Sequence, residues 1–219
     1  MAEVGSGKKA VLKLVVGPLE VNCYIVWDEH TGDAFIIDPG AEPEKIIRAV
    51  RKKDLCVRYI VNTHGHFDHV GANAEIKNAF GAPVAVHAKD KGLLASSHEH
   101  SAFFGVVSKP QPLPDIALED GMRLDAGGIS LVVLHTPGHT EGGVSLYCRN
   151  HYMVFTGDTL FRGSVGRTDF EGGSFEELIK SIKTKLLPLG DMVRVLPGHG
   201  PETTIEEEKN INPFVSELV

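Results

Sequence analysis

The sequence has little cysteine, no long apolar run and no extended cationic tract. Its three cysteines, Cys23, Cys56 and Cys148, form no C-x-x-C pair, so a disulfide framework is not expected, and we interpret them as small buried hydrophobic residues. No apolar stretch approaches the roughly 18 residues that span a membrane. The N-terminus also lacks the apolar segment of a secretory signal. We therefore expect a cytoplasmic protein with no membrane partner.

Basic residues are also fewer than acidic residues. The 219 residues carry 22 Lys and Arg against 29 Asp and Glu, a formal net charge of −7, and no basic run is longer than 51–53. Sequence-independent nucleic-acid binding needs a cationic surface, so no nucleic-acid partner is expected. The composition, 42% hydrophobic and 23% charged, is globular. We expect one domain over residues 10–219 and a disordered N-terminus over 1–9; nothing in the sequence indicates an oligomeric state.

The apolar segments predict two groups of strands, each followed by helices. The first group has strands at 11–16, 21–27, 34–37, 57–62 and 83–86, with helices at 42–53 and 71–80. The second has strands at 122–124, 129–134, 144–148, 152–156 and 193–196, with a helix capped by Ser174 and another at 204–210. The proline-containing stretch 89–116 is expected to be a surface excursion that begins with a short helix. This order predicts a layered α/β arrangement, with sheets packed together and helices outside.

Histidine is the abundant residue, with 11 copies. The stretch 62–69 reads NTHGHFDH, and in an extended chain His64, His66 and Asp68 point the same way. His69 breaks this alternation, so a turn into the next helix must begin there, and the turn lets Asp68 and His69 face a different point. Imidazole nitrogens and carboxylates are the ligands of zinc, iron and manganese.

Further candidate ligands follow hydrophobic strands later in the chain. Pro-Gly, which favours a tight turn, precedes both His139 and His199, and another strand leads into Asp158. Sites of layered α/β proteins often lie in loops at the carboxyl ends of strands. We therefore predict a site with enough ligands for two metal ions about 3.5 Å apart, bridged by a carboxylate. Its candidate residues are His64, His66, Asp68, His69, His139, Asp158 and His199.

The remaining histidines show no such setting. Five are interpreted as surface or hydrogen-bonded residues: His30, His87, His98, His100 and His151. His135 lies four residues before His139, and we interpret it first as a packed or hydrogen-bonded side chain; contact with a ligand or with substrate is the alternative.

These motifs together resemble the signature of the metallo-β-lactamase superfamily. The likeness consists of H-x-H-x-D-H at 64–69, TPGHT around His139, GDT around Asp158, and His199, and it extends over about 11–214. It implies a four-layer αββα sandwich, an α/β (α+β) fold, with a dinuclear metal centre between the sheets.

The resemblance also implies how the ligands are shared. One metal would be bound by His64, His66 and His139. The other would be bound by Asp68, His69 and His199, and Asp158 would bridge the two ions.

Within the superfamily, the sequence is most similar to small glyoxalase II-like (hydroxyacylglutathione hydrolase-like) hydrolases. The segments 157–161, 166–170 and 197–204 carry this likeness. We expect the chain to lack the C-terminal helical domain of full glyoxalase II. Where those enzymes use a Lys and a Tyr to hold glutathione, this sequence has Arg167 and Phe170, the expected substrate-binding residues. Arg can meet a carboxylate but Phe offers no hydroxyl donor, so the identity of the thiol carrier is left open.

The likeness implies a metal-dependent hydrolase that cleaves a small thioester or ester. Two divalent ions, with zinc expected first and iron or manganese as alternatives, would bring the pKa of a bridging water toward about 7 and so supply hydroxide. Asp68 would be the catalytic residue that accepts a hydrogen bond from this hydroxide and orients it. Arg167 would either anchor an acidic substrate or form a structural ion pair with Asp169.

Other activities compatible with the sequence differ in metal and chemistry. A persulfide dioxygenase of the same superfamily would use one iron held by fewer ligands. A metal-stabilised binding module would have no turnover at all. True β-lactamases commonly lack an aspartate equivalent to Asp158, which disfavours that activity.

Overall fold

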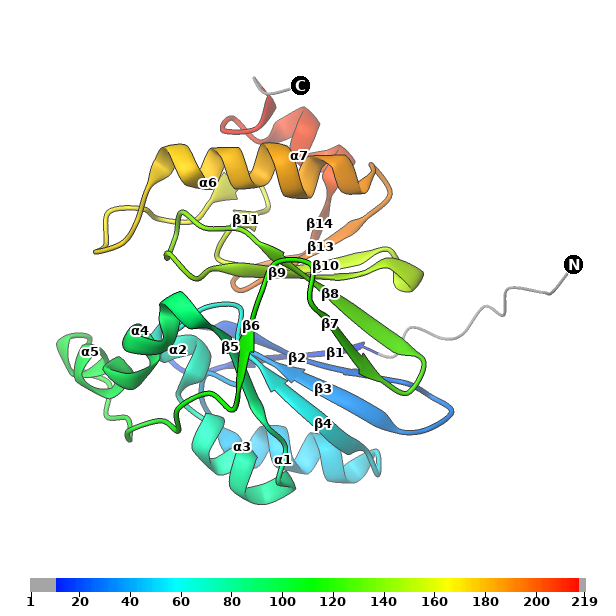
Figure 1. The fold of residues 1–219 in the computed structure, drawn as a ribbon, viewed down its shortest axis with the longest axis vertical. Helices are drawn as coiled ribbons and strands as arrows, with labels where there is room; N and C mark the ends of the chain where they lie inside the picture. Colours follow the sequence, from blue (N-terminus) through cyan, green and yellow to red (C-terminus); the bar gives the residue numbers. More distant parts are fainter. Residues whose placement is uncertain (1–10, 217–219) are drawn as a thin grey trace, which may run out of the picture.

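Two six-stranded sheets lie face to face in the computed structural model, with helices on both outer faces (Figure 1). The structure describes residues 11–216. The N-terminal segment 1–9, predicted to be disordered, lies outside the described residues. The arrangement is the αββα sandwich that the sequence predicted.

The first sheet follows chain order. Its strands are β1 (Val11–Val16), β2 (Val21–Trp27), β3 (Asp33–Ile37), β4 (Cys56–Val61), β5 (Val84–His87) and β6 (Ile116–Leu118). The pairs β1/β2 and β2/β3 are antiparallel, whereas β3 to β6 run parallel. Parallel neighbours need crossover connections, and α1 (Pro43–Lys52) and α3 (Asn73–Phe80) provide two of them on the outer face. Pro43 opens α1, and Ile46 and Val50, one turn apart, are its buried residues.

The second sheet has the order β14-β13-β10-β9-β8-β7. Its strands are β7 (Arg123–Ala126), β8 (Ile129–His135), β9 (Val144–Cys148), β10 (Met153–Gly157), β13 (Arg194–Pro197) and β14 (Thr203–Thr204), and the short helix η2 (Arg149–His151) joins β9 to β10. The outer helices are α6 (Phe175–Ser181), which continues through η3 (Ile182–Leu186) and η4 (Leu187–Leu189), and α7 (Ile205–Ile211). The hydroxyls of Ser174 and Thr204 cap α6 and α7 by accepting the N–H groups of Glu177 and Glu207 at 3.3 and 3.1 Å.

Three short helices, α2 (Phe67–Val70), α4 (Lys91–Ala95) and α5 (Ser97–Phe103), gather at one end of the sandwich, on the left in Figure 1. The other short elements are η1 (Ala88–Asp90) and the hairpin of β11 (Leu160–Phe161) with β12 (Ser164–Val165). The excursion predicted over 89–116 therefore contains helices and ends in β6, an edge strand that the sequence did not indicate.

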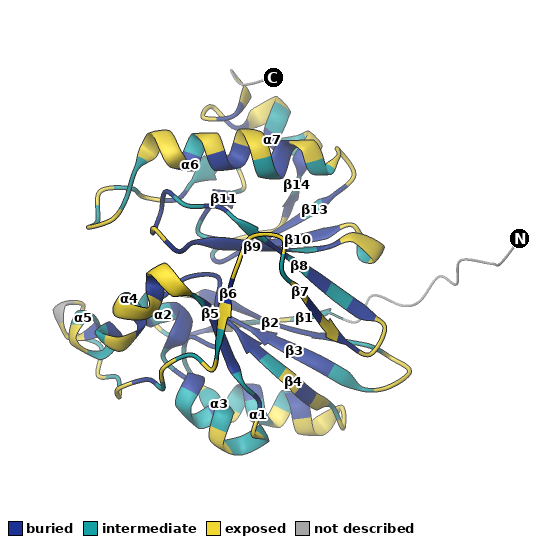
Figure 2. Ribbon diagram, in the orientation of Figure 1, coloured by how far each residue is buried: buried dark blue, intermediate teal, exposed yellow. Residues whose placement is uncertain are grey.

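Buried apolar residues form three main layers between these elements, and Figure 2 shows the strands largely buried (dark blue) beneath helices with exposed (yellow) outer surfaces. One layer lies between the sheets and includes Phe35 and Phe155. A second lies under α1 and α3, and a third under α6 and α7. Cys23 and Cys148 are buried as predicted, but Cys56 is exposed, because it opens β4 at the end of the sheet away from the short helices. Among residues 11–216, no helix is long and apolar enough to cross a membrane.

Phe155 gives a test of the layer between the sheets. Its ring is 1% exposed and packs edge-on against Tyr24 of the opposite sheet, with centroids 5.1 Å apart. We expect Phe155→Ala to lower the free energy of unfolding by about 3–5 kcal/mol in urea denaturation, because it opens a cavity between the sheets. Met192→Ala, at a side chain that is 77% exposed, is the control and should change it by no more than about 0.5 kcal/mol. Equal effects of the two substitutions would contradict this account of the core.

Candidate metal centre

Four strands end at the same edge of the sandwich, and each leads into a candidate ligand. The loop after β4 carries His64 to His69, and His139, Asp158 and His199 follow β8, β10 and β13. The first loop comes from one sheet and the other three come from the second sheet. The structure brings all of the predicted ligands together between the two sheets.

Glycines allow this close approach. Gly157 has a φ of +49°, and a Cβ there would lie 2.3 Å from Thr63 Oγ1. At Gly198 a Cβ would lie 2.4 Å from Asp158 Oδ1 and 2.7 Å from His69 Cε1. A side chain at either position would separate the loops that deliver the candidate ligands.

His64, His66 and His139 form one group of candidate ligands. Each offers one ring nitrogen, and these three nitrogens all lie within 4.8 Å of one another. His139 Nε2 lies 2.9 Å from His66 Nδ1. The rings of His64 and His66 are almost perpendicular, at 88°. This group contains nitrogen alone, the ligand set of many zinc and iron sites.

A second group consists of Asp68, His69 and His199. His199 Nε2 lies 3.4 Å from Asp68 Oδ2 and 3.3 Å from His69 Nε2. α2 begins at Phe67, two residues earlier than the turn predicted at His69, and so carries Asp68 and His69 in its single turn. The helical turn gives these two side chains a direction different from that of His64 and His66.

Asp158 lies between the two groups. Its Oδ1 is 3.4 Å from His69 Nε2, and its Oδ2 is 3.6 Å from both His139 Nε2 and His199 Nε2. The carboxylate thus lies within 3.6 Å of ligand nitrogens from both groups, the position expected of a bridging ligand.

Contacts behind the imidazoles fix their orientation. His139 Nδ1 donates to the carbonyl of Arg167 at 2.7 Å, and His199 Nδ1 donates to the carbonyl of Leu19 at 3.0 Å. A carbonyl oxygen can only accept, so Nε2 of both rings keeps its lone pair for the centre. His69 Nδ1 lies 3.0 Å from the buried carboxylate of Asp38.

The pKa values of the histidines in this centre depend on burial and on neighbouring charges. Burial, followed by the nearby His139, lowers the pKa of His66 to about 3, so this imidazole is neutral at pH 7. Burial also acts to lower the pKa of His69. The carboxylates of Asp158, Asp68 and Asp38 outweigh it and raise the pKa of this imidazole above its usual value. The centre therefore has negative potential around His69, which favours a cation.

Two buried atoms give a direct test of whether a metal fits. His64 Nε2 and Asp158 Oδ1 are both inaccessible to solvent, and neither has a hydrogen-bond partner among the described residues. An unpaired polar atom in the interior is costly, and for a carboxylate oxygen the cost is larger still. Bound cations would satisfy both atoms, so the residues present fit a metal centre.

The centre opens into a cleft of about 990 Å³. Ligand residues His66, Asp68, His139, Asp158 and His199 line its inner part. Apolar walls come from Leu19, Phe67, Leu93, Phe104, Phe161 and Phe170. A cleft of this size, with convergent polar groups at one point, is typical of a small-molecule site.

Arg167 and Phe170 both line the cleft, as expected of substrate-binding residues. Arg167 makes a two-pronged ion pair with Asp169, at 2.9 and 2.8 Å, and its guanidinium lies 4.3 Å over the ring of Phe170. The ion pair foreseen as one of its two roles is therefore present. The Arg167 side chain stays largely exposed in its pair with Asp169, and anchoring of substrate by Arg167 stays a prediction.

The other histidines lie outside both groups. His135 Nε2 donates to the carbonyl of Glu141 at 2.9 Å, and the ring stacks on His87 with centroids 4.3 Å apart, so His135 is hydrogen-bonded as expected. His100 lines the outer cleft. Asp38 is a residue that the sequence analysis did not single out, although it follows β3 as Asp158 follows β10.

Comparison with known proteins agrees with this geometry. Residues 16–199 match the model of the metallo-beta-lactamase superfamily. The chain belongs to the metallo-β-lactamase superfamily. It is 42% identical over 203 residues to the hydroxyacylglutathione hydrolase GloC of Haemophilus influenzae, an alignment that covers 92% of this chain and 95% of GloC.

Solved members of the superfamily have the same fold over nearly the whole chain. BLEG-1, a B3 metallo-beta-lactamase, is 36% identical with a TM-score of 0.88, and the match covers 94% of this chain and 99% of BLEG-1. TTHA1623, crystallised in a di-iron-bound form, is 42% identical with a TM-score of 0.86 and coverage of 93% and 99%. These superfamily relatives support a metallohydrolase.

Asp158 provides a test of the bridging geometry. We expect the purified protein to hold about two transition-metal ions per chain and Asp158→Ala to hold about one, because both groups lose a shared oxygen ligand. Elemental analysis after dialysis measures this ratio. Asp169→Ala, which removes an exposed carboxylate near the same cleft, should leave the ratio unchanged. Full metal content in Asp158→Ala would contradict a bridging role.

Proposed function

We propose that this metallohydrolase cleaves a thioester of the hydroxyacylglutathione type, or a related small ester. The observation that carries the proposal is the cluster of histidines and aspartates at the inner end of a cleft of about 990 Å³. Similarity to GloC over 92% of the chain supports the thioester. The substrate is a small molecule in this proposal, and no nucleic acid takes part.

Each of the two cations would be bound by three of the described side chains, and one further carboxylate would bridge the two ions. His64, His66 and His139 would hold the first ion, Asp68, His69 and His199 the second, and Asp158 both. Zinc is the first expectation for both ions; the di-iron form of TTHA1623 makes iron the leading alternative, and manganese remains a third. When bound, such ions supply Lewis acidity, lowering the pKa of water toward about 7 and polarising a carbonyl.

Asp68 is proposed as the catalytic residue. It lines the cleft, and burial acts against its ionised form, but the imidazoles of His69 and His199 hold its pKa below its usual value. It therefore stays a carboxylate, able to accept a hydrogen bond from the attacking water and to orient the water oxygen. The oxygen forms a bond to the acyl carbon, the carbon–sulfur bond breaks, and the thiolate leaves without a strong general acid. The thiolate takes up one of the two protons of the water and the other passes to solvent, so the products are a carboxylate and a thiol.

Three rival activities can be separated in one set of assays. A persulfide dioxygenase would consume oxygen with glutathione persulfide. A β-lactamase, the activity printed for the similar BLEG-1, would open a chromogenic β-lactam. A binding module would lose its fold on metal removal but cleave none of these compounds. We expect S-lactoylglutathione or another small thioester to give the highest kcat/KM, and oxygen uptake with no thioester cleavage would replace this proposal by the dioxygenase.

His139 and His135 form a matched pair for testing the centre. We expect His139→Ala to lower thioesterase kcat/KM by at least about a thousandfold, since it removes a nitrogen that faces both His66 and Asp158. His135→Ala removes an imidazole four residues away that hydrogen-bonds to the Glu141 carbonyl and stacks on His87, outside both ligand groups, and should retain most activity. Steady-state kinetics and circular dichroism on both variants measure activity and fold. Retention of activity in His139→Ala would contradict its assignment.

Arg167 tests how substrate is held. If its guanidinium meets an acidic group of the substrate, Arg167→Ala should raise KM roughly tenfold while kcat changes little. The change breaks the ion pair with Asp169 as well, so Asp169→Ala is the control and should leave KM near the wild-type value. Equal increases of KM in both variants would show that Arg167 acts only through its ion pair.

A further inference from the structure

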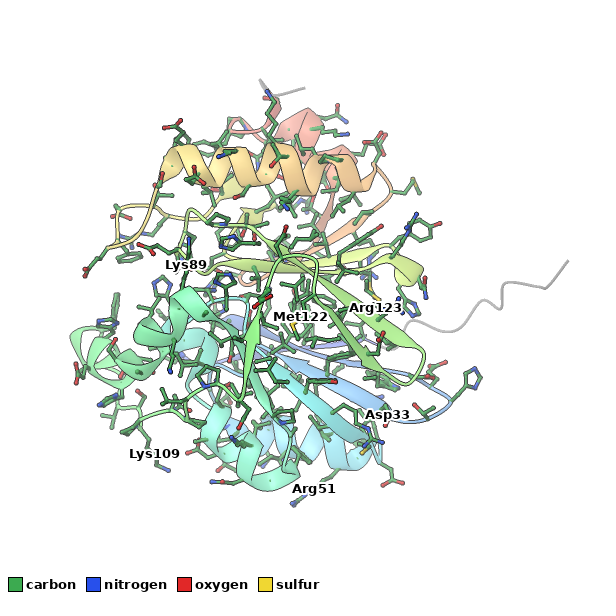
Figure 3. The ribbon with its side chains drawn as sticks, in the orientation of Figure 1. Asp33, Arg51, Lys89, Lys109, Met122 and Arg123 are labelled. Atoms are coloured by element: carbon green, nitrogen blue, oxygen red, sulfur yellow. The ribbon has the colours of Figure 1, made fainter. Side chains whose placement is uncertain are left out.

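A buried carboxylate lies directly behind the first group of ligands. Asp90 ends η1 and is 2% exposed, and its carboxylate hydrogen-bonds to residues other than the candidate ligands. It lies at the end of the sandwich where the loops of both sheets meet, next to Lys89, which is labelled in Figure 3. Nothing in the proposed reaction uses this residue.

Asp90 joins the two loops that deliver His64, His66 and His139. Its Oδ2 accepts the backbone N–H of Gly65 at 3.0 Å and the hydroxyl of Thr140 at 2.7 Å. Its Oδ1 accepts the backbone N–H of Gly142 at 2.7 Å. Gly65 is the residue between His64 and His66, and Thr140 directly follows His139. One side chain therefore connects a loop of the first sheet with a loop of the second.

The packing leaves little freedom in this connection. A Cβ at Gly65 would lie 2.9 Å from the Asp90 carbonyl, and one at Gly142 would lie 2.5 Å from Asp90 Oδ1. Leu94, one turn later in α4, is fully buried and packs with Val70 and Val86. The carboxylate is thus fixed to the body of the protein, and both loops are held against it.

From this arrangement, which rests on the proposed metal centre, we infer that Asp90 is a positioning residue for the first metal. It sets the distance between the His64–His66 loop and His139, and so preorganises three nitrogens around one cation. The second group does not depend on it, because Asp38 and the Leu19 carbonyl orient His69 and His199. Removing the Asp90 contacts should therefore weaken one metal position and spare the other.

The chain contains a matched control. Glu208 is also fully buried and accepts three hydrogen bonds, from Gly163, Thr203 and Asn212 at 2.9, 2.7 and 2.7 Å. None of these partners adjoins a metal-ligand residue in the sequence. Glu208→Gln and Asp90→Asn make the same chemical change at a buried carboxylate with the same number of donors, and both should lower thermal stability.

The test is a zinc titration of the metal-free proteins against a chromophoric chelator, together with thermal melting. For Asp90→Asn we expect one zinc equivalent to bind about tenfold to a hundredfold more weakly and the other to change by less than about threefold. Glu208→Gln should leave both affinities near the wild-type values. In a His66→Ala background, where the first position is already impaired, Asp90→Asn should have no further effect on the remaining zinc.

A milder pair keeps the test decisive if Asp90→Asn does not fold. Thr140→Val removes only the hydroxyl donor, whereas Thr140→Ser retains it. We expect Thr140→Val to lower the affinity for the same zinc equivalent and Thr140→Ser to keep that affinity near the wild-type value. Asp90→Asn that behaves like Glu208→Gln would overturn the positioning role while leaving the proposed function intact. Failure of the wild type to bind two zinc ions would instead remove the proposed function itself.

Discussion

Gathering imidazoles and carboxylates in the interior is the constraint on which this structure depends. His64 and His69 are almost completely buried, and Asp158 carries a buried oxygen with no hydrogen-bond partner among the described residues. Without a cation, the desolvation of the carboxylates and the close approach of the nitrogens would destabilise the folded protein. Two bound cations would offset this cost, because the same atoms would become metal ligands. The loops therefore meet at a site whose polar atoms are fully satisfied only when metal ions are bound.

The sandwich provides this point because strands from both sheets end at one edge. The core between the sheets holds β4 and β10 in fixed relation, and the loops that follow these strands meet across the gap. Backbone carbonyls and buried carboxylates then orient the rings, through the Arg167 carbonyl for His139 and Asp38 for His69. The carbonyl of Arg167 contacts the candidate ligand His139, and Arg167 also lines the cleft. The proposed substrate-binding surface and the metal centre therefore share one short segment of the chain.

Much of the architecture could be predicted from the sequence because alternating and continuous apolar runs mark strands strongly. The predicted strands 11–16, 21–27 and 144–148 agree with β1, β2 and β9. The site could be predicted as a group because each candidate ligand follows a strand, and ends of such strands converge. The π-helical turn η3 and the three-residue strand β6 could not, because tertiary packing and pairing with β5 decide them.

The supporting residues were harder to find, for physical reasons. Asp38 has the same position relative to its strand as Asp158, so a consistent application of the strand-end rule would have found it. Asp90 lies in a segment with no clear periodicity, and its importance depends on contacts with residues 25 and 52 positions away. Sequence motifs identify the groups that bind, whereas a group such as Asp90, which positions them through contacts far along the chain, is recognised only once the chain is folded.

Anomalous diffraction from crystals of the metal-loaded protein would locate the bound ions. We predict two strong peaks roughly 3.5 Å apart, one against the nitrogens of His64, His66 and His139 and the other against Asp68, His69 and His199, with Asp158 reaching both. A map with no peak among these side chains after soaking in excess zinc or iron, or with metal bound elsewhere on the chain, would contradict it.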